Sequence, residues 1–447
     1  MPDQLRDQIF KGLMKTPVLD AHTHVDAEHL TARGLHDVLL YHMVISELYS
    51  AGCPDGERLS EEPDEAEVEY RMERALPYLK YIRNTSCFWG VRIILKDLYG
   101  WDKPVTKDNW RELHGIIKKK YRESSWHSKI MKKGRIEKLC TELWRRKDGR
   151  ADGILTFSLE WAFFGRCQYN QFDTALLELE NTWDKTEVGT PLPVTIGEDG
   201  VKIAKRIRTI EDVHDAIRHY CDLIPFSEIV NVAQWLSTDI EQRSFSAEEM
   251  KDALQRRDTA GPKERDIYAG YLFECFLTEL EKRNERTAVN VGIGAEPLPF
   301  ETGSKLKTDT IFEIADIAKR HPNIDFHIFL ASAQHNQAFC SVVRETPNIY
   351  LSGYWWHSFF PSFIARTLEE RLDMLPLKKQ IGFFSDAYCL DWSYAKSVIV
   401  RKQLAEVLEK KVEMGQYTVD SALDIARTLL YETTEENLGM LRWGKKA

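Results

Sequence analysis

Short apolar runs alternate with longer helical stretches along this chain, and the alternation restricts its fold more than any other feature. Parallel strands need a crossover connection, usually a helix, so this order predicts βαβ units in a parallel sheet. An eighth strand is expected between 168 and 221, where 192–196 is a poor candidate. Seven runs have strand character, at residues 18–25, 153–159, 230–235, 288–293, 324–330, 349–354 and 381–385.

The first of these runs ends in two histidines, His22 and His24, with Thr23 between them. Residues i and i+2 of a β-strand point to the same side, so both imidazoles can reach one metal ion. Histidine nitrogens bind Zn²⁺ and related ions, and a site with two or three protein ligands keeps a position open for water or substrate. The pair therefore predicts a catalytic metal site, with a surface histidine pair on an edge strand as the alternative.

The last apolar run ends in the carboxylate of Asp386. The first and last strands of a closed barrel are neighbours, which would bring Asp386 to His22 and His24. We expect these three residues to bind one divalent ion, and Zn²⁺ suits nitrogen and oxygen ligands. A His-x-His on the first strand with an Asp on the last is the metal site of the amidohydrolase superfamily, which the chain resembles.

Within that superfamily the chain is similar to the uronate (glucuronate) isomerases nearly from end to end. The resemblance implies a distorted (β/α)8 (TIM) barrel and an enzyme that interconverts the aldose and ketose forms of a sugar acid. It rests on His22-Thr23-His24, Leu35-His36-Asp37-Val38-Leu39-Leu40, Gly52, Val291-Gly292-Ile293-Gly294-Ala295, Trp355-Trp356 after Pro347-Asn348-Ile349-Tyr350, and Gly382-Phe383-Phe384-Ser385-Asp386.

The departures from this family concern arginines. Where the isomerases carry an Arg two residues after the metal-binding Asp, this chain has Tyr388. Two further arginines correspond to Ser46 and Tyr49, and the Asp-His-Tyr segment before them reads Tyr41-His42-Met43. An Arg fork is the natural bidentate partner of a sugar-acid carboxylate, so the metal site carries over while the substrate differs. We assign Tyr388 to catalysis and His42 to substrate binding.

Barrel enzymes place their active groups at the carboxyl ends of strands, which selects further candidates. Glu296 follows the fifth strand as an acid, a base or a ligand, with a helix-capping or surface carboxylate as the alternative. His335 falls in the loop after the sixth strand, where it is either catalytic or merely exposed. Trp355 and Trp356 end the seventh strand and suit the C–H faces of a sugar, although core packing explains one of them. Arg166 is the obvious replacement cation or a surface residue.

Two features of the later strands limit the site. Many superfamily members have a His on the fifth strand, where this chain has Gly292, so a second metal ion is not expected. His327 stands in the middle of the apolar run 324–330, and we interpret it as a core histidine with satisfied hydrogen bonds.

A stretch without a recognisable strand, residues 27–151, separates the first two runs and is rich in helical patterns such as 65–73. A crossover needs far fewer residues, so we expect an inserted helical subdomain that caps the barrel mouth. Two amphipathic helices, 393–413 and 419–430, should close the ring. Barrels with insertions exceed 400 residues as single domains, so we treat 1–447 as one domain.

Composition excludes several other classes. The net charge of −9 and the pI near 5.9 argue against a nucleic-acid partner. The eight cysteines show no Cys-x-x-Cys pair, as expected of buried free thiols. No apolar stretch approaches the length of a membrane span, and residues 1–15 read as an amphipathic helix instead of a signal peptide. We expect a cytoplasmic protein with a small-molecule substrate, and a homo-oligomer is compatible with the sequence.

Three functions agree with these patterns. The first is a metal-dependent isomerase acting on a sugar acid or a related carbohydrate. The second is a metal-dependent hydrolase of an amide, ester or lactone, which the missing arginines favour. The third is a catalytically inactive barrel that binds or scaffolds, against which the retention of all three metal-binding candidates speaks.

Overall fold

The computed structural model describes most of the chain, with gaps at several loops. Four site candidates, Glu296, Arg166, Trp355 and Trp356, and the strand candidate 192–196 lie outside the described residues. The described residues are 2–54, 65–146, 151, 153–160, 172–183, 206–236, 241, 243–283, 288–293, 309–330, 333–354 and 359–438.

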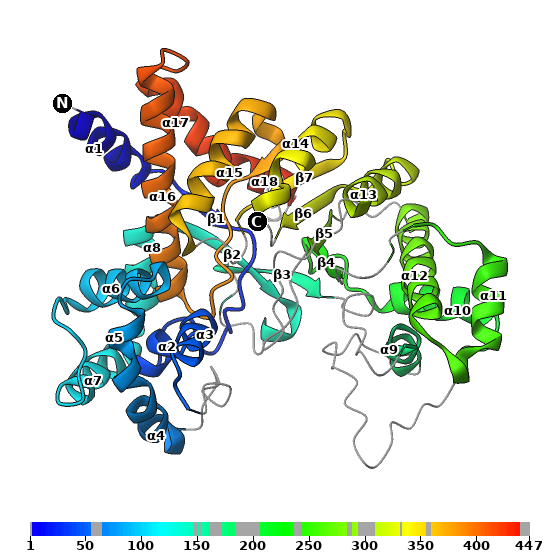
Figure 1. Ribbon diagram of the computed structural model, residues 1–447, viewed down its shortest axis with the longest axis horizontal. Coiled ribbons are helices and arrows are strands. Elements are labelled where there is room, and N and C mark those ends of the chain that lie inside the picture. The colour runs from blue at the N-terminus through cyan, green and yellow to red at the C-terminus, as the bar shows by residue number, and fades with distance from the viewer. Residues whose placement is uncertain are drawn as a thin grey trace.

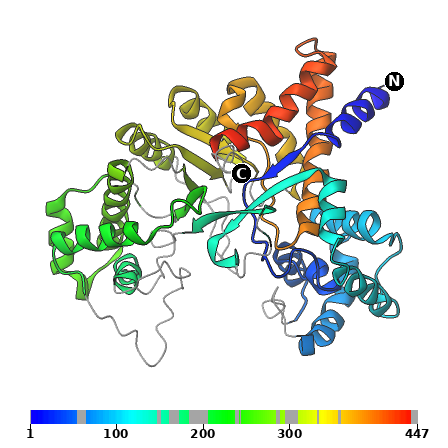
Figure 2. The ribbon, with the colours of Figure 1, turned by 180° about the vertical axis from the view of Figure 1, so that it is seen from behind.

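The core of the fold is one curled sheet of eight parallel strands, which neighbour each other in chain order (Figure 1). Helices cover its outer face, as the view from behind also shows (Figure 2). The strands are β1 Val18–Asp20, β2 Ile136–Glu142, β3 Leu155–Glu160, β4 Asn231–Leu236, β5 Ala288–Ile293, β6 Phe326–Leu330, β7 Ile349–Ser352 and β8 Gln380–Ile381. This confirms the expected α/β class and the distorted (β/α)8 barrel.

The first and last strands meet through bonds beyond their regular ends. The Ala21 N–H donates to the Phe383 carbonyl at 3.3 Å, and the His24 N–H donates to the Ala387 carbonyl at 2.8 Å. Both regular strands are shorter than the apolar runs that contain them, so the residues after Asp20 and after Ile381 run in irregular backbone. The candidate metal ligands lie on these two irregular segments.

The eighth strand, which the apolar runs did not reveal, is β2. The expectation that it lies between residues 168 and 221 is wrong. The described parts of that interval instead contain helices α9 and α10. Strand β2 carries the charged residues Glu137 and Lys138 near its start and the buried Glu142 at its end. These charges interrupt the apolar pattern by which the other strands were recognised.

The helical insertion lies between β1 and β2 (Figure 1, blue to cyan). Its last helix ends at Gly134, and strand β2 occupies part of the range 27–151 that we assigned to the insertion. Its helices are α2 Leu35–Leu39, α3 His42–Ser50, α4 Glu65–Ala75, the short η2 Leu76–Tyr78, α5 Leu79–Ile82, α6 Ser86–Tyr99, α7 Trp110–Tyr121 and α8 Trp126–Gly134.

The other helices surround the sheet. Helix α16 begins close to the expected position, and α17 continues into a π-helical turn, η8 Thr428–Glu432. Within the described ranges, no helix combines the length and the apolar character needed to cross a lipid bilayer. The helices are α1 Pro2–Leu13, α9 Thr174–Thr182, α10 Ile210–Leu223, α11 Ala247–Gln255, α12 Pro262–Arg283, α13 Asp309–Arg320, α14 Asn336–Glu345, α15 Pro361–Met374, α16 Leu390–Glu413, α17 Val419–Arg427 and α18 Thr433–Asn437, with the short turns η3 Leu143–Arg146, η4 Arg257–Thr259, η5 Ala333–His335 and η7 Leu377–Lys379.

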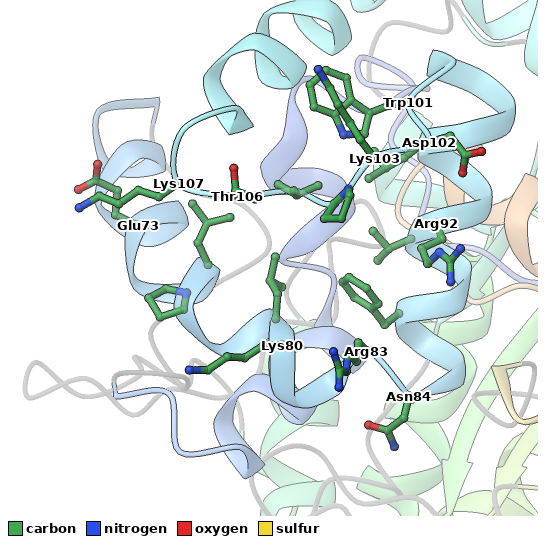
Figure 3. Close-up of a pocket in the computed structure, with 18 residues that line it drawn as sticks. Glu73, Lys80, Arg83, Asn84, Arg92, Trp101, Asp102, Lys103, Thr106 and Lys107 are labelled. Carbon is green, nitrogen blue, oxygen red and sulfur yellow. The ribbon is translucent and has the colours of Figure 1, made fainter.

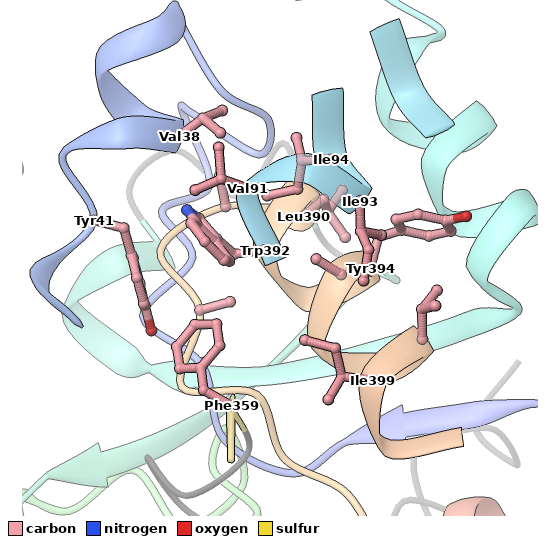
Figure 4. Close-up of a cluster of buried hydrophobic side chains, with 14 of the residues drawn as sticks. Val38, Tyr41, Val91, Ile93, Ile94, Phe359, Leu390, Trp392, Tyr394 and Ile399 are labelled. Atoms are coloured by element: carbon pink, nitrogen blue, oxygen red, sulfur yellow. The ribbon is translucent and has the colours of Figure 1, made fainter. Parts of the chain in front are cut away.

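An apolar cluster fastens the insertion to α16 (Figure 4). The fully buried Trp392 stacks on the ring of Tyr41 with 4.6 Å between the ring centroids. Helix α6 packs closely against α16 at Gly90, where a Cβ atom would lie 2.7 Å from the Trp392 ring. Because α16 follows β8 directly, this packing sets the insertion against the end of the barrel that carries the site.

Candidate metal centre

Three residues distant in sequence converge at the barrel mouth. The Nε2 atoms of His22 and His24 lie 3.3 and 3.2 Å from Asp386 Oδ1, and one ligand atom from each residue fits within a group spanning 4.8 Å. Two ligands of a tetrahedral ion with bonds of about 2.1 Å lie about 3.4 Å apart. The two His–Asp distances and the donor types therefore fit a single Zn²⁺-like ion.

The backbone explains why both histidines point inward. The N–H of Thr23 donates to the Cys140 carbonyl of β2 at 2.7 Å, and its hydroxyl donates to the same carbonyl at 2.9 Å. The next residue, His24, bonds on the opposite side to the segment after β8. Across residues 22–24 the bonding sides alternate as they do in a strand, so residues 22 and 24 share one face.

Glu142, at the carboxyl end of β2, supports the histidines and was missed by the sequence analysis. One carboxylate oxygen accepts a hydrogen bond from His24 Nδ1. The other lies 2.7 Å from Arg145 Nε and accepts from the Thr141 hydroxyl at 3.1 Å. A carboxylate on Nδ1 fixes the tautomer that leaves Nε2 for a metal ion. The rule that active groups end strands would have found Glu142, had β2 been recognised.

The electrostatics of the site favour a cation. Burial raises the pKa of Glu142, but the nearby His24 outweighs it and brings the pKa to about 2. Burial likewise opposes ionisation of Asp386, whose pKa is nevertheless held well below its usual range by hydrogen bonds from His22 and His24. His24 then carries a proton on each ring nitrogen, and a metal ion would take the place of the proton on Nε2. Both carboxylates are therefore ionised at neutral pH in a largely buried setting.

Two further predicted residues border the three ligands. His42 Nε2 lies 3.7 Å from Asp386 Oδ2. The ring of Tyr388 lies 4.8 Å from the His24 ring and 5.6 Å from the His42 ring, centroid to centroid. His42 and Tyr388 thus stand beside the position that a metal ion would occupy.

Solved structures with the same architecture identify the fold. Uronate isomerase from Thermotoga maritima matches with a TM-score of 0.73 at 14% identity, over 97% of each chain. Glucuronate isomerase from Caulobacter crescentus matches with a TM-score of 0.76 at 12% identity, over 98% of this chain and 94% of that one. This chain has the uronate isomerase fold.

A third structure, a candidate metal-dependent hydrolase from Lactobacillus casei, matches the same fold with a TM-score of 0.57 at 10% identity, over 97% of each chain. No family model and no curated protein matches the sequence. The uronate isomerase fold is therefore established by architecture, while the identities are too low to carry an activity over.

The positions that hold arginines in uronate isomerases serve other purposes here. The Ser46 hydroxyl donates to the His42 carbonyl within α3 at 3.0 Å, and Tyr49 is 51% exposed. A different cation, Arg145, lies over the Tyr388 ring at 5.5 Å from its centroid. Because its Nε lies against Glu142, Arg145 orients that carboxylate. Sequence analysis named Arg166 instead and overlooked Arg145.

His335 forms part of the short turn η5, before α14, and is half-buried. Burial lowers its pKa. Among the contacts of the described residues, none joins His335 to His22, His24 or Asp386, so its catalytic assignment stays a prediction.

Two cavities lie near these elements. The smaller, of about 190 Å³, borders the centre and includes Tyr41, Arg145 and Tyr388 in its wall. The larger, of about 1170 Å³, lies in the helical insertion between α4, α6 and the segment 101–107 (Figure 3). Only the smaller shares residues with the surroundings of the three ligands.

Glu142→Gln is expected to weaken metal binding by about 10- to 100-fold, because the amide cannot accept the His24 Nδ1 proton with the strength of a carboxylate. The measurement is a Zn²⁺ titration against a chromophoric chelator. Glu137→Gln, an exposed position on the same strand, is the matched control. Equal affinities in the two variants would contradict the role given to Glu142.

His327 proves to be buried, but the expectation that its hydrogen bonds are satisfied is wrong. Within the described part of the chain, neither ring nitrogen has a hydrogen-bond partner, and the side chain is 1% exposed. Burial, with a smaller contribution from Lys379, lowers its pKa to about 3. The unfolded chain therefore binds a proton between pH 6.5 and about 3 that the folded chain excludes.

His327→Leu should remove this acid sensitivity. In the wild type, the excluded proton lowers the free energy of unfolding by up to about 1.4 kcal/mol for each pH unit below 6.5. Urea unfolding is measured at pH 7, 5.5 and 4.5. As the pH falls, the free energy of unfolding of the variant should rise relative to that of the wild type. The same substitution at the half-buried His127 is the control. A constant difference across this range would refute the assignment.

Proposed function

We propose that this protein is a metal-dependent isomerase that interconverts the aldose and ketose forms of a sugar acid or a related carbohydrate. The observation that carries the proposal is the convergence of His22, His24 and Asp386, supported by Glu142, in a uronate isomerase fold. We assign the three ligands to one divalent ion and expect Zn²⁺.

When bound, such an ion polarises substrate oxygens as a Lewis acid. The protein's own groups then handle protons. Asp386 Oδ1 faces both histidines, while Oδ2 faces His42 Nε2 at 3.7 Å. Isomerisation transfers a hydrogen from C2 to C1 and moves the C2 hydroxyl proton to the C1 carbonyl oxygen. We assign the hydroxyl proton to Asp386 Oδ2, with His42 as its neighbouring donor and acceptor.

The surroundings suit a small polar molecule with C–H faces. Tyr41, Tyr388 and Arg145 share the wall of the small cavity beside the ligands. We assign Tyr388 to contact with the substrate, where a phenol can stack or hydrogen-bond but cannot neutralise a carboxylate.

The second candidate is a metal-dependent hydrolase. Two observations favour it, namely the structural match to the Lactobacillus casei protein and the tyrosine at position 388. Hydrolysis of an amide, ester or lactone would use the same ligands and the same carboxylate. The two reactions differ in whether a solvent oxygen enters the product.

One assay separates the candidates. Metal-reconstituted protein is incubated in ¹⁸O-labelled water with a panel of uronic acids, lactones and N-acyl sugars. Ketose formation without a new carboxyl oxygen is the expected result, since label at C1 or C2 can also enter by reversible hydration of the carbonyl. Label in a newly formed carboxylate would establish hydrolysis and overturn the isomerase. No turnover of any compound by protein with full metal occupancy would favour the inactive barrel. Asp386→Asn is the control for contaminating activity.

A further inference from the structure

The turn that presents Asp386 has an unusual backbone. Asp386 has a φ of 57°, in the left-handed region that residues other than glycine seldom occupy. Such a conformation is strained and persists only where the surroundings impose it. The three residues Ser385, Asp386 and Ala387 are therefore held by something outside the turn.

Every backbone N–H and C=O of these three residues is hydrogen bonded. The strand side supplies three partners: the Ser385 N–H donates to Asp20 Oδ1 at 2.7 Å, the Asp386 N–H donates to the His22 carbonyl at 2.9 Å, and the Ala387 carbonyl accepts from His24. The Ala387 N–H donates to the Ser385 hydroxyl. The carbonyls of Ser385 and Asp386 remain, and side chains from two helical regions bond to them.

Those side chains are Lys396 and Tyr41. The ammonium of Lys396, on α16, donates to the Ser385 carbonyl and lies 3.0 Å from the Tyr41 hydroxyl. The Tyr41 hydroxyl in turn donates to the Asp386 carbonyl at 2.6 Å. The Tyr41 ring packs against both Trp392 and Phe359, whose rings also contact each other (Figure 4), and this packing restricts the movement of its hydroxyl.

Burial of Lys396 carries a large desolvation penalty. Its side chain is 0% exposed, and its ammonium lies 4.1 Å from the centroid of the Phe359 ring. Taking an ammonium out of water is unfavourable unless its new partners compensate for the lost hydration. An uncharged side chain would pack here without the desolvation penalty. We therefore look for a role that requires the ammonium group.

We propose that Asp20, Tyr41 and Lys396 form a clamp, a set of positioning residues that holds Asp386 in the left-handed conformation needed to bind the metal ion. The inference rests on the metal centre of the proposed function. Without the clamp, two buried carbonyls lose their donors and Asp386 can relax to an ordinary φ. Its carboxylate then leaves the point shared with His22 and His24.

The test compares Zn²⁺ affinities of purified metal-free variants by chelator competition. Lys396→Met should weaken binding by about 10- to 100-fold, the range seen for residues that orient ligands. Tyr41→Phe keeps the stacked ring and should weaken it less. Because the two donors touch, the double variant should bind about as weakly as Lys396→Met alone.

Lys411→Met is the matched control, since Lys411 is a second buried lysine on α16 that pairs with Asp373. It should lower the melting temperature without changing Zn²⁺ affinity. Wild-type affinity in Lys396→Met, or a loss no larger than in Lys411→Met, would overturn the clamp. If Lys396→Met does not fold, unchanged affinity in Tyr41→Phe overturns it. Wild-type protein that binds no Zn²⁺ would instead refute the proposed metal centre.

Discussion

His22→Ala should abolish metal binding, while the wild-type protein purified without chelator should contain about one equivalent of Zn²⁺. His22 is one of the three candidate ligands found among the described residues, and its Nε2 lies 3.3 Å from the shared Asp386 oxygen. Removing a residue that merely orients a ligand costs about 10- to 100-fold in affinity, so removing a ligand should cost more. Elemental analysis gives the stoichiometry, and turnover of the best panel compound should fall with it.

His127→Ala is the control for this experiment, because His127 is a half-buried histidine on α8, within the helical insertion. It should retain the metal content of the wild type. Full occupancy in His22→Ala would show that the ion, if present, is bound elsewhere.

D-Glucuronate should be a poor substrate, with kcat/KM at least about 100-fold below that of the preferred compound. The three arginine positions of uronate isomerases are Ser46, Tyr49 and Tyr388, and the structure gives none of them a cationic role. A charge-assisted hydrogen bond contributes about 1.5 to 3 kcal/mol, so losing two weakens a bound carboxylate by two or more orders of magnitude.

The measurement compares D-glucuronate with its methyl ester and with a neutral aldose of the same stereochemistry. The kcat/KM of D-glucuronate is expected to be no higher than that of the methyl ester or the neutral aldose. An ordinary kcat/KM on D-glucuronate that Arg166→Ala abolishes would contradict the prediction, because it would show that the cation had moved to position 166. Arg145→Ala would test in the same way the cation that lies over the Tyr388 ring.

Much of the fold follows from local pattern. Seven of the eight strands overlap apolar runs that are recognisable in sequence, because strands buried on both faces need nearly continuous apolar residues. The metal ligands were equally accessible, since His22 and His24 share a face by the two-residue period of a strand. Asp386 was predicted to lie beside them because the first and last strands of a closed barrel are neighbours.

The remaining features depend on contacts that no local pattern encodes. Strand β2 was not predicted because Glu142 is charged. Burial of a charged residue can be inferred only when its partners, here His24 and Arg145, are known. No local pattern relates Tyr41 to Lys396, yet folding brings the Tyr41 hydroxyl and the Lys396 ammonium 3.0 Å apart from positions 355 residues distant in the chain.

The sequence by itself therefore determined the class of fold and the three candidate ligands, because both arise from backbone periodicity and the order of strands. Only the tertiary structure decided which groups orient those ligands and which backbone conformation presents Asp386. The reason is physical. Hydrophobic burial is non-directional and leaves a regular trace along the chain, whereas hydrogen bonds to a buried charge depend on positions within a few tenths of an ångström.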